Sequence, residues 1–221
     1  MSEQSNAHTP LFVDTLQQSV SKEAAPLLNF VLKHIKMIAA GLLALVVLIS
    51  GVGMYHYMHD QKILTAQTEL ATLAAGASTE AQLADLKAFV ETVPAEVRPA
   101  ALLTLAKASL RVNDYAAAES AWAALQATGI DSMREIAGMG RANAYAKMGK
   151  LTEAVTVLET LVPQASKAYV LTVKHQLALM AEQSGDVKKA LAVYKELETA
   201  VPAANKKFYT HKIASLSNQK K

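Results

Sequence analysis

The feature that most constrains this chain is an uninterrupted apolar stretch over residues 37–55. Its nineteen residues include no charged side chain, no proline and no side-chain amide. A helix rises about 1.5 Å per residue, so this stretch would be about 28 Å long, close to the roughly 30 Å hydrocarbon core of a bilayer. The sequence therefore predicts one transmembrane helix over residues 37–55, with the rest of the chain divided between the two sides of a membrane.

Basic residues near the stretch predict its orientation. Lys22, Lys33 and Lys36 precede it closely, whereas the first twenty residues after it contain only Lys62. Because Lys and Arg are retained on the cytoplasmic side, residues 1–36 are expected to form a cytoplasmic tail. A cleaved signal peptide is the alternative. The apolar run is longer than a signal-peptide core and no A-x-A pattern follows it directly, which favours an uncleaved anchor.

The residues that flank the predicted span leave two structural questions open. The interrupted apolar run over residues 11–32 could form a helix on or in the near leaflet, with Pro26 at a helix start, or a loosely ordered tail. On the far side, His56 and His59 are spaced so that both could face one metal ion. A belt of amphipathic rings at the membrane interface is the ordinary explanation, and no metal site is predicted there.

The composition of the whole chain narrows the fold and excludes several functions. The hydrophobic fraction is 52% with only 5% aromatic residues, so the apolar content is mostly alanine and leucine, which are strong helix formers. The absence of cysteine excludes disulfides and thiolate metal sites. The 22 Lys and Arg nearly balance the 19 Asp and Glu and do not cluster, which gives no support for nucleic-acid binding.

Beyond residue 60 the chain repeats itself with a period of 36 residues. Each copy has a glycine or asparagine that can end one helix, and an alanine that lets paired helices approach closely. A large residue and a leucine follow in each copy and can fill the space between successive pairs. Asp114 and Asp186 are available as N-caps of second helices. The columns are Asn113, Gly149 and Gly185; Ala118, Ala154 and Ala190; Trp122, Leu158 and Tyr194; and Leu125, Leu161 and Leu197.

This period predicts an all-α fold in which a single transmembrane helix is followed by an α-solenoid domain over residues 63–217. A unit cannot bury its apolar face alone, so stacked units and a C-terminal capping helix are expected. The first unit has Gln82 at the alanine position, which leaves open whether it is a true repeat. Ser132-x-x-Glu135 predicts a capping box that opens the third unit. The expected units are 63–98, 99–134, 135–170 and 171–206, with the capping helix around residues 204–216.

The repeated residues resemble tetratricopeptide repeats, although Ser109 stands where that family usually has tyrosine. The resemblance implies a helical scaffold that binds other proteins. The layout of a short tail, one anchor and a repeat domain resembles the YfgM family of bacterial inner-membrane proteins, which is associated with the protein translocon and periplasmic chaperones. That likeness implies a single-pass inner-membrane protein with a periplasmic C-terminal domain. The matching residues are Ala142, Tyr145, Gly149, Leu151 and Ala154 in the third unit and Ala178, Gly185, Ala190, Tyr194 and Pro202 in the fourth.

In such repeats the first helix of each unit lines a concave face, and this implies where a partner would bind. The face would carry a mildly basic strip beside apolar side chains, suited to an acidic segment or a C-terminal carboxylate. The alternative is a solvated face whose basic residues contact only water. The predicted groove residues are Leu103, Lys107, Leu110, Arg111, Met139, Asn143, Lys147, His175, Leu179, Glu182 and Gln183.

The sequence carries no motif for catalysis. It has no Gly-rich phosphate loop, no H-E-x-x-H and no G-x-S-x-G, so neither an enzyme nor a cofactor is expected. The leading hypothesis is a membrane-anchored periplasmic scaffold that binds other envelope proteins. An accessory subunit that contacts a larger membrane complex through residues 11–32 and the span is the alternative. Self-association through the repeats is a third hypothesis.

Overall fold

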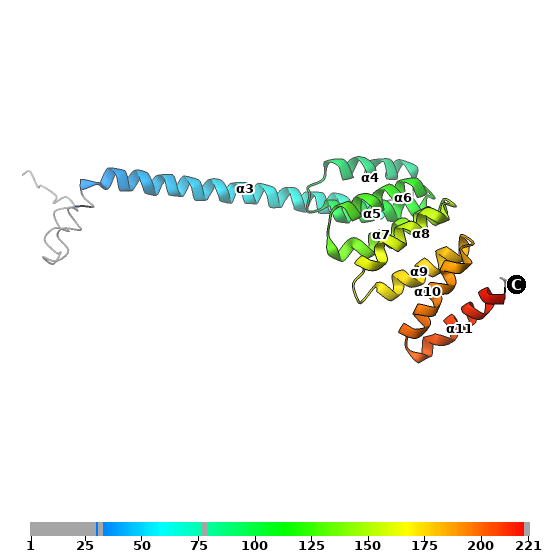
Figure 1. Cartoon of the computed structure of the whole chain (residues 1–221). Coiled ribbons are helices and arrows are strands. Elements are labelled where there is room, and N and C mark those ends of the chain that lie inside the picture. The colour runs from blue at the N-terminus through cyan, green and yellow to red at the C-terminus, as the bar shows by residue number, and fades with distance from the viewer. Residues whose placement is uncertain (1–29, 31–32, 77–78, 219–221) are drawn as a thin grey trace, which may run out of the picture. The chain divides into compact units, whose positions relative to one another are not determined.

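The computed structural model describes residue 30, residues 33–76 and residues 79–218 (Figure 1). Within these residues the chain is α-helical, with nine α-helices, one short 3₁₀ helix and no strand. The predicted all-α fold is thereby confirmed. The juxtamembrane helix predicted within residues 11–32 lies outside the described residues except for Phe30.

The described helices follow one another with short connections. The chain divides into two units, residues 1–60 and 61–221, and α3 runs from the first into the second. Within the second unit, consecutive helices from α4 to α11 stack in order as antiparallel neighbours (Figure 1). The helices are α3 (Ile35–Gly76), α4 (Glu80–Thr92), α5 (Arg98–Arg111), α6 (Tyr115–Ala127), α7 (Asp131–Lys147), α8 (Leu151–Leu161), η1 (Val162–Gln164), α9 (Val170–Gln183), α10 (Val187–Ala200) and α11 (Ala203–Asn218).

Helix α3 contains the apolar stretch. Of the described helices, it is the one that is long and apolar enough to cross a membrane. Its large apolar side chains are exposed there, Met37 at 72% and Leu43 at 70%. A membrane span and an N-terminal signal sequence both have these properties. The helix does not stop at Tyr55 but continues to Gly76, because no glycine or proline interrupts residues 54–75.

The repeat register is visible in the backbone of the helical hairpins. Asn113, Gly149 and Gly185 have φ values of 61°, 76° and 81°, the left-handed conformation predicted for these helix ends. Asp114 and Asp186 then cap the following helices, with side-chain oxygens that accept from backbone N–H groups at 3.0 and 2.9 Å. In all three turns the next amide donates to the carbonyl five residues before, Asp114 to Ser109, Lys150 to Tyr145 and Asp186 to Ala181, each at 2.9 Å.

The same repeat register determines which side chains form the core. The repeated alanines Ala118, Ala154 and Ala190 are fully buried, as their role between paired helices requires. The first unit differs because Gln82 occupies the alanine position. A Cβ atom added at Gly76 would lie 2.8 Å from the Gln82 Nε2 atom, so the missing side chain at the end of α3 makes room for the larger residue on α4. The buried large residues of the register are Leu86, Trp122, Leu158 and Tyr194, with Phe89, Leu125, Leu161 and Leu197.

The predicted capping box at the start of the third unit is wrong. Helix α7 begins at Asp131, with Ile130 as its N-cap residue and no side-chain cap. The helix starts too early for Ser132 to cap it. The buried Glu135 carboxylate instead accepts a hydrogen bond from the Ser166 backbone N–H at 2.8 Å, 31 residues away. Glu135 therefore stabilises the loop that precedes α9 rather than its own helix end.

Replacing Glu135 by Gln is expected to destabilise the fold in a pH-dependent way. The Ser166 N–H favours the charged carboxylate more than burial disfavours it, so the pKa of Glu135 lies below its usual value of 4.5. The stabilisation is therefore present above about pH 4.5 and is lost as the pH falls through the lowered pKa. We expect Glu135→Gln to cost about 1–2 kcal/mol at pH 7 and less at pH 3.

Urea unfolding at both pH values, followed by circular dichroism, measures this difference. Glu153→Gln on the exposed side of α8 is the matched control and should change little at either pH. An equal loss of stability at pH 7 and pH 3 would contradict a role for the Glu135 charge.

Candidate functional site

The first part of the predicted groove lies on α5. Lys107 and Arg111 are one helical turn apart and are both exposed, so they share one face of the helix. Leu103 and Leu110 are half-buried beside them. Helix α5 thus presents two cations next to apolar surface, as the sequence predicted for the first helix of the second unit.

The second part lies on α7, the first helix of the third unit. Asn143 and Lys147 are exposed and one turn apart, and Met139 is half-buried. The Met139 backbone carbonyl accepts a hydrogen bond from Gln176 Nε2 at 3.1 Å, which joins α7 to α9. Both α5 and α7 pack against α6, which holds the two helices in one stack.

Three exposed cations on these two helices have no carboxylate partner in the part of the chain that the structure describes. Among the described residues, none forms an ion pair with Lys107, Arg111 or Lys147, which we call the basic strip. By contrast, Arg141 and Lys174 are paired with carboxylates at 2.6 and 2.8 Å. The basic strip therefore keeps charge that is available to an acidic ligand.

The groove residues of the fourth unit have a different environment, because α11 packs against them. The Glu182 carboxylate accepts hydrogen bonds from Lys212 Nζ and from the Tyr194 hydroxyl, both at 2.8 Å. The His175 Nδ1 atom lies 3.2 Å from the Tyr209 hydroxyl. Of the other two predicted residues, Leu179 is half-buried and Gln183 is exposed. In this unit two of the four predicted binding residues, His175 and Glu182, contact the capping helix of their own chain.

Burial and charge where α11 contacts α9 shift the pKa values of Glu182 and His175. Burial raises the pKa of Glu182, but the hydrogen bonds from Lys212 and Tyr194 outweigh it and hold the pKa below its usual value. Burial and the Lys212 charge together lower the pKa of His175. Both groups are therefore in the protonation state that suits docking of α11 near neutral pH, with Glu182 charged and His175 neutral.

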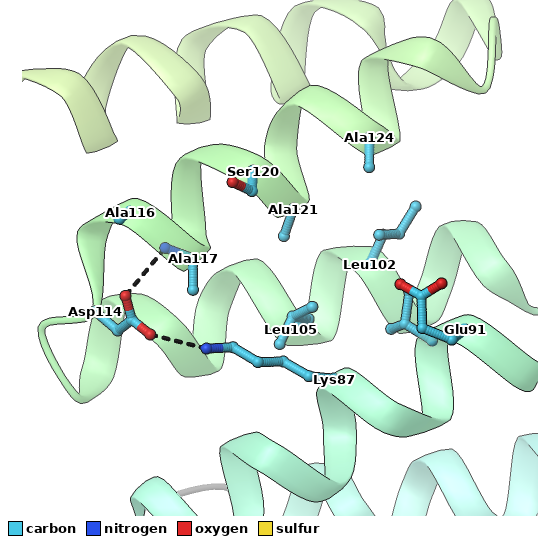
Figure 2. A pocket seen from close by; sticks show the side chains of 11 residues that line it. Lys87, Glu91, Leu102, Leu105, Asp114, Ala116, Ala117, Ser120, Ala121 and Ala124 are labelled. Atoms are coloured by element: carbon cyan, nitrogen blue, oxygen red, sulfur yellow. Dashed lines mark hydrogen bonds and ion pairs between the residues drawn. The ribbon is translucent and has the colours of Figure 1, made fainter.

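A hollow that the sequence reasoning missed lies between α4 and α6. It has a volume of about 640 Å³ and a floor formed by Leu102 and Leu105 of α5 (Figure 2). A smaller hollow of about 370 Å³ continues it toward Thr128. We call the two together the α4–α6 groove. Their shared lining residues are Val90, Glu91, Leu102 and Ala124.

One ion pair crosses the end of this groove. Lys87 of α4 reaches Asp114 at the start of α6, with Nζ and Oδ2 3.0 Å apart (Figure 2). The Ala117 amide and Lys87 together lower the pKa of Asp114. The side wall on α6 is formed by small residues, Ala116, Ala117, Ser120, Ala121 and Ala124.

Comparison with known proteins agrees with this architecture. Residues 29–219 match the family described as tetratricopeptide repeat-like domain. The chain belongs to this family. Tetratricopeptide repeat-like domains are protein-binding helical scaffolds and are typically not catalytic. The predicted repeat fold and the predicted general role as a protein-binding scaffold are therefore confirmed.

Solved structures show the same fold. One is a crystal structure of nearly identical TPR-like repeats of a candidate kinesin light chain from Podosopora anserina. It is 20% identical in sequence and has a TM-score of 0.52. The match covers 72% of this chain and 85% of the chain in that crystal structure. At this identity the likeness concerns the fold alone. No curated protein matches the chain.

Proposed function

We propose that this tetratricopeptide repeat-like protein is a membrane-anchored scaffold that binds another envelope protein through the basic strip. Its parts would be a cytoplasmic tail over residues 1–36, a transmembrane helix over residues 37–55 and a periplasmic repeat domain over residues 63–217. The location would be the bacterial inner membrane. Components of the translocon and periplasmic chaperones are the first partners to test, because the layout resembles the YfgM family.

The observation that carries this proposal is the uncompensated charge on α5 and α7. Lys107, Arg111 and Lys147 are exposed and have no ion-pair partner among the described residues, and α5 also presents half-buried Leu103 and Leu110. An acidic segment of a partner could pair with the cations and cover the apolar side chains. Charge-assisted hydrogen bonds of this kind are about twice as strong as neutral ones.

Anchoring is supported by the exposed apolar side chains of α3 and by the lysines that precede the stretch. Lys33 and Lys36 are described and Lys22 lies before them, and Lys and Arg are retained on the cytoplasmic side of a membrane. An accessory-subunit role through the tail is the second candidate, because the apolar residues over 11–32 are more than an anchor requires.

Charge reversal of the basic strip is expected to abolish partner capture. The chain has no cysteine, so Asn143→Cys provides a single site for a membrane-impermeant photo-cross-linker in spheroplasts. The cross-linked partner should be lost at least about tenfold when Lys107→Glu, Arg111→Glu and Lys147→Glu are added. Lys188→Cys on the exposed face of α10 is the matched control.

Two results would contradict the proposal. Labelling of Asn143→Cys only after cell lysis would place the domain inside the cell. Capture of the same partner regardless of the charge reversal, but lost when residues 1–30 are deleted, would favour the accessory-subunit role.

A further inference from the structure

We propose that α11 is a pH-sensitive cap: protonation of His175 weakens the docking of α11 on α9 and uncovers the inward face of the fourth unit. The inference goes beyond the proposed function and depends on neither the basic strip nor a membrane anchor. It rests on the position of the histidine in the contact, on the charges around it and on the place of α11 in the stack.

His175 lies where α11 closes over α9. Its ring centroid is 5.8 Å from that of Tyr209 and 5.6 Å from that of Phe208, and its Nδ1 atom is 3.2 Å from the Tyr209 hydroxyl. A neutral imidazole can accept a hydrogen bond from that hydroxyl, whereas an imidazolium has a proton on both nitrogens and accepts none. Protonation therefore forces the Tyr209 hydroxyl to turn its proton away and places a charge in a contact that suits a neutral ring.

A cation is already held in this contact. The Lys212 ammonium of α11 donates to both carboxylate oxygens of Glu182 on α9, at 2.8 and 2.9 Å. His175 and Glu182 are seven residues apart, about two helical turns, so both face α11 from one side of α9. Glu182 also accepts from the Tyr194 hydroxyl of α10, so its charge is already used. Burial and the Lys212 charge lower the pKa of His175, which agrees with this geometry.

Carboxylates on the neighbouring helices are engaged elsewhere, and within residues 131–218 none of them is paired with His175. Glu153 is on the exposed side of α8. On α7, the Arg141 guanidinium is paired with Glu119 of α6. The engaged carboxylates and their partners are Asp131 with Arg134, Glu135 with the Ser166 N–H, Glu159 and Asp186 with Lys189, Glu196 with Lys174, and Glu198 with the Thr210 hydroxyl.

Helix α11 stands at the end of the described stack, so it can open without the other units. Its side-chain hydrogen bonds and ring contacts with other described helices are made to α9 and α10. In a stack of repeats each unit contacts only its neighbours, and an end helix opens at a lower free energy than an internal one. His175 occupies the position of Leu103 and Met139 in the two preceding units. Opening of α11 therefore extends the inward face by one unit.

The pH range of the switch follows from His175 and Glu182. The pKa of His175 is below 6.5 in the docked state, so docking is strongest above about pH 6.5 and weakens as the pH falls below it. The pKa of Glu182 is held below 4.5, so this carboxylate stays charged at pH 5.5. A released His175 with the ordinary pKa of 6.5 is about ten times more often protonated than neutral at pH 5.5, so the open fraction of α11 rises at most about tenfold.

Hydrogen exchange of the full-length protein in nanodiscs, followed by mass spectrometry, measures how often α11 opens. After correction for the intrinsic pH dependence of amide exchange, the protection of α11 should be about three- to tenfold lower at pH 5.5 than at pH 7.5. The protection of α5 and α6 should stay the same.

Three variants test whether His175 is the group that titrates. His175→Phe keeps an aromatic ring against α11, and His175→Gln keeps a polar side chain. Both should abolish the pH dependence of α11 protection, whatever they do to its absolute value. His211→Gln is the matched control, because His211 is exposed on α11 itself, and this variant should keep the pH dependence.

Three results would overturn the inference: α11 protection that does not change with pH in the unsubstituted protein, an equal fall of protection in α5 and α6, or the same pH dependence in His175→Phe and His175→Gln. The first two are measured on the unsubstituted chain, so they do not depend on whether a variant still docks α11. The basic strip is not involved, and failure here would leave the proposed function untouched.

Discussion

Gly140→Ala is expected to lower the free energy of unfolding by about 2 kcal/mol or more, although alanine normally favours a helix. A Cβ atom at position 140 would lie 2.4 and 2.6 Å from the Cε2 and Cδ2 atoms of Trp122. The Trp122 ring is only 5% exposed and cannot move aside without disturbing the core around it. Overpacking of this kind typically costs about 1–3 kcal/mol and here should exceed the helix-propensity gain of about 1 kcal/mol.

Three further variants, one of them Trp122→Leu alone, separate the clash from other effects. Gly138→Ala lies on the same helix and gains the same propensity, but its Cβ would meet the Leu161 methyl carbons, which can shift more easily than a ring. It should therefore cost less. In Gly140→Ala combined with Trp122→Leu, the residue found at the equivalent position 158 replaces the indole, and the double variant should be more stable than the two single effects predict. Urea unfolding measures all four; a Gly140→Ala protein as stable as the original would refute the clash.

The register of the repeat could be predicted because it depends on local requirements that recur every 36 residues. A left-handed helix end needs glycine or asparagine, and Asn113, Gly149 and Gly185 meet this need. Closely paired helices need a small residue, and the alanines at 118, 154 and 190 are fully buried. Each requirement is visible in single residues, so their coincidence in one period was sufficient to predict the stacked hairpins.

Contacts between units could not be predicted in the same way. The period shows which face of a helix is buried, but not which side chain of the next unit it meets. The contact of Trp122 with Gly140 and the hydrogen bond of Glu135 to Ser166 both depend on the offset between neighbouring hairpins. A capping box was the local explanation for Glu135, and the distant Ser166 N–H proved to be its partner.

The two candidate surfaces illustrate the difference between features that could be predicted from the sequence and features that could not. Lys107 and Arg111 of the basic strip follow from helical spacing alone, and their use by a partner stays a prediction. The α4–α6 groove could not be noticed by comparing columns, because the column at 117, 153 and 189 holds Ala, Glu and Lys and has no consensus. Nor could the sequence show that Lys87 would pair with Asp114 at the end of the groove.

The fourth unit also shows why binding positions transferred from the repeat family have to be checked against the structure. His175 and Glu182 occupy inward positions, as in an internal unit. Helix α11, however, packs where the first helix of a fifth unit would stand, so Tyr209 and Lys212 contact them. The predicted capping helix is thus joined to its neighbour by specific polar contacts as well as by apolar packing.

Ending the chain at Val201 is expected to lower the free energy of unfolding by about 3 kcal/mol and to weaken the fourth unit most. Removal of α11 exposes the apolar surface that Tyr209 and Leu216, 9% and 2% exposed, now cover. Burial of each is worth about 1.5–3 kcal/mol, and the ordering entropy of the helix offsets part of the gain. Urea unfolding followed by circular dichroism measures the loss. Deletion of residues 219–221 alone is the control and should have no effect.

The pKa of Glu182 distinguishes loss of this contact from general unfolding. Without α11, Glu182 loses part of the burial that raises its pKa and the Lys212 hydrogen bonds that lower it, so its pKa should change, and an NMR titration would detect the change. Because each unit contacts only its neighbours, the single tryptophan, Trp122 in the second unit, should report less destabilisation than circular dichroism does. An equal response of both probes would mean that the stack unfolds as one unit, and unchanged stability would show that α11 is not a cap.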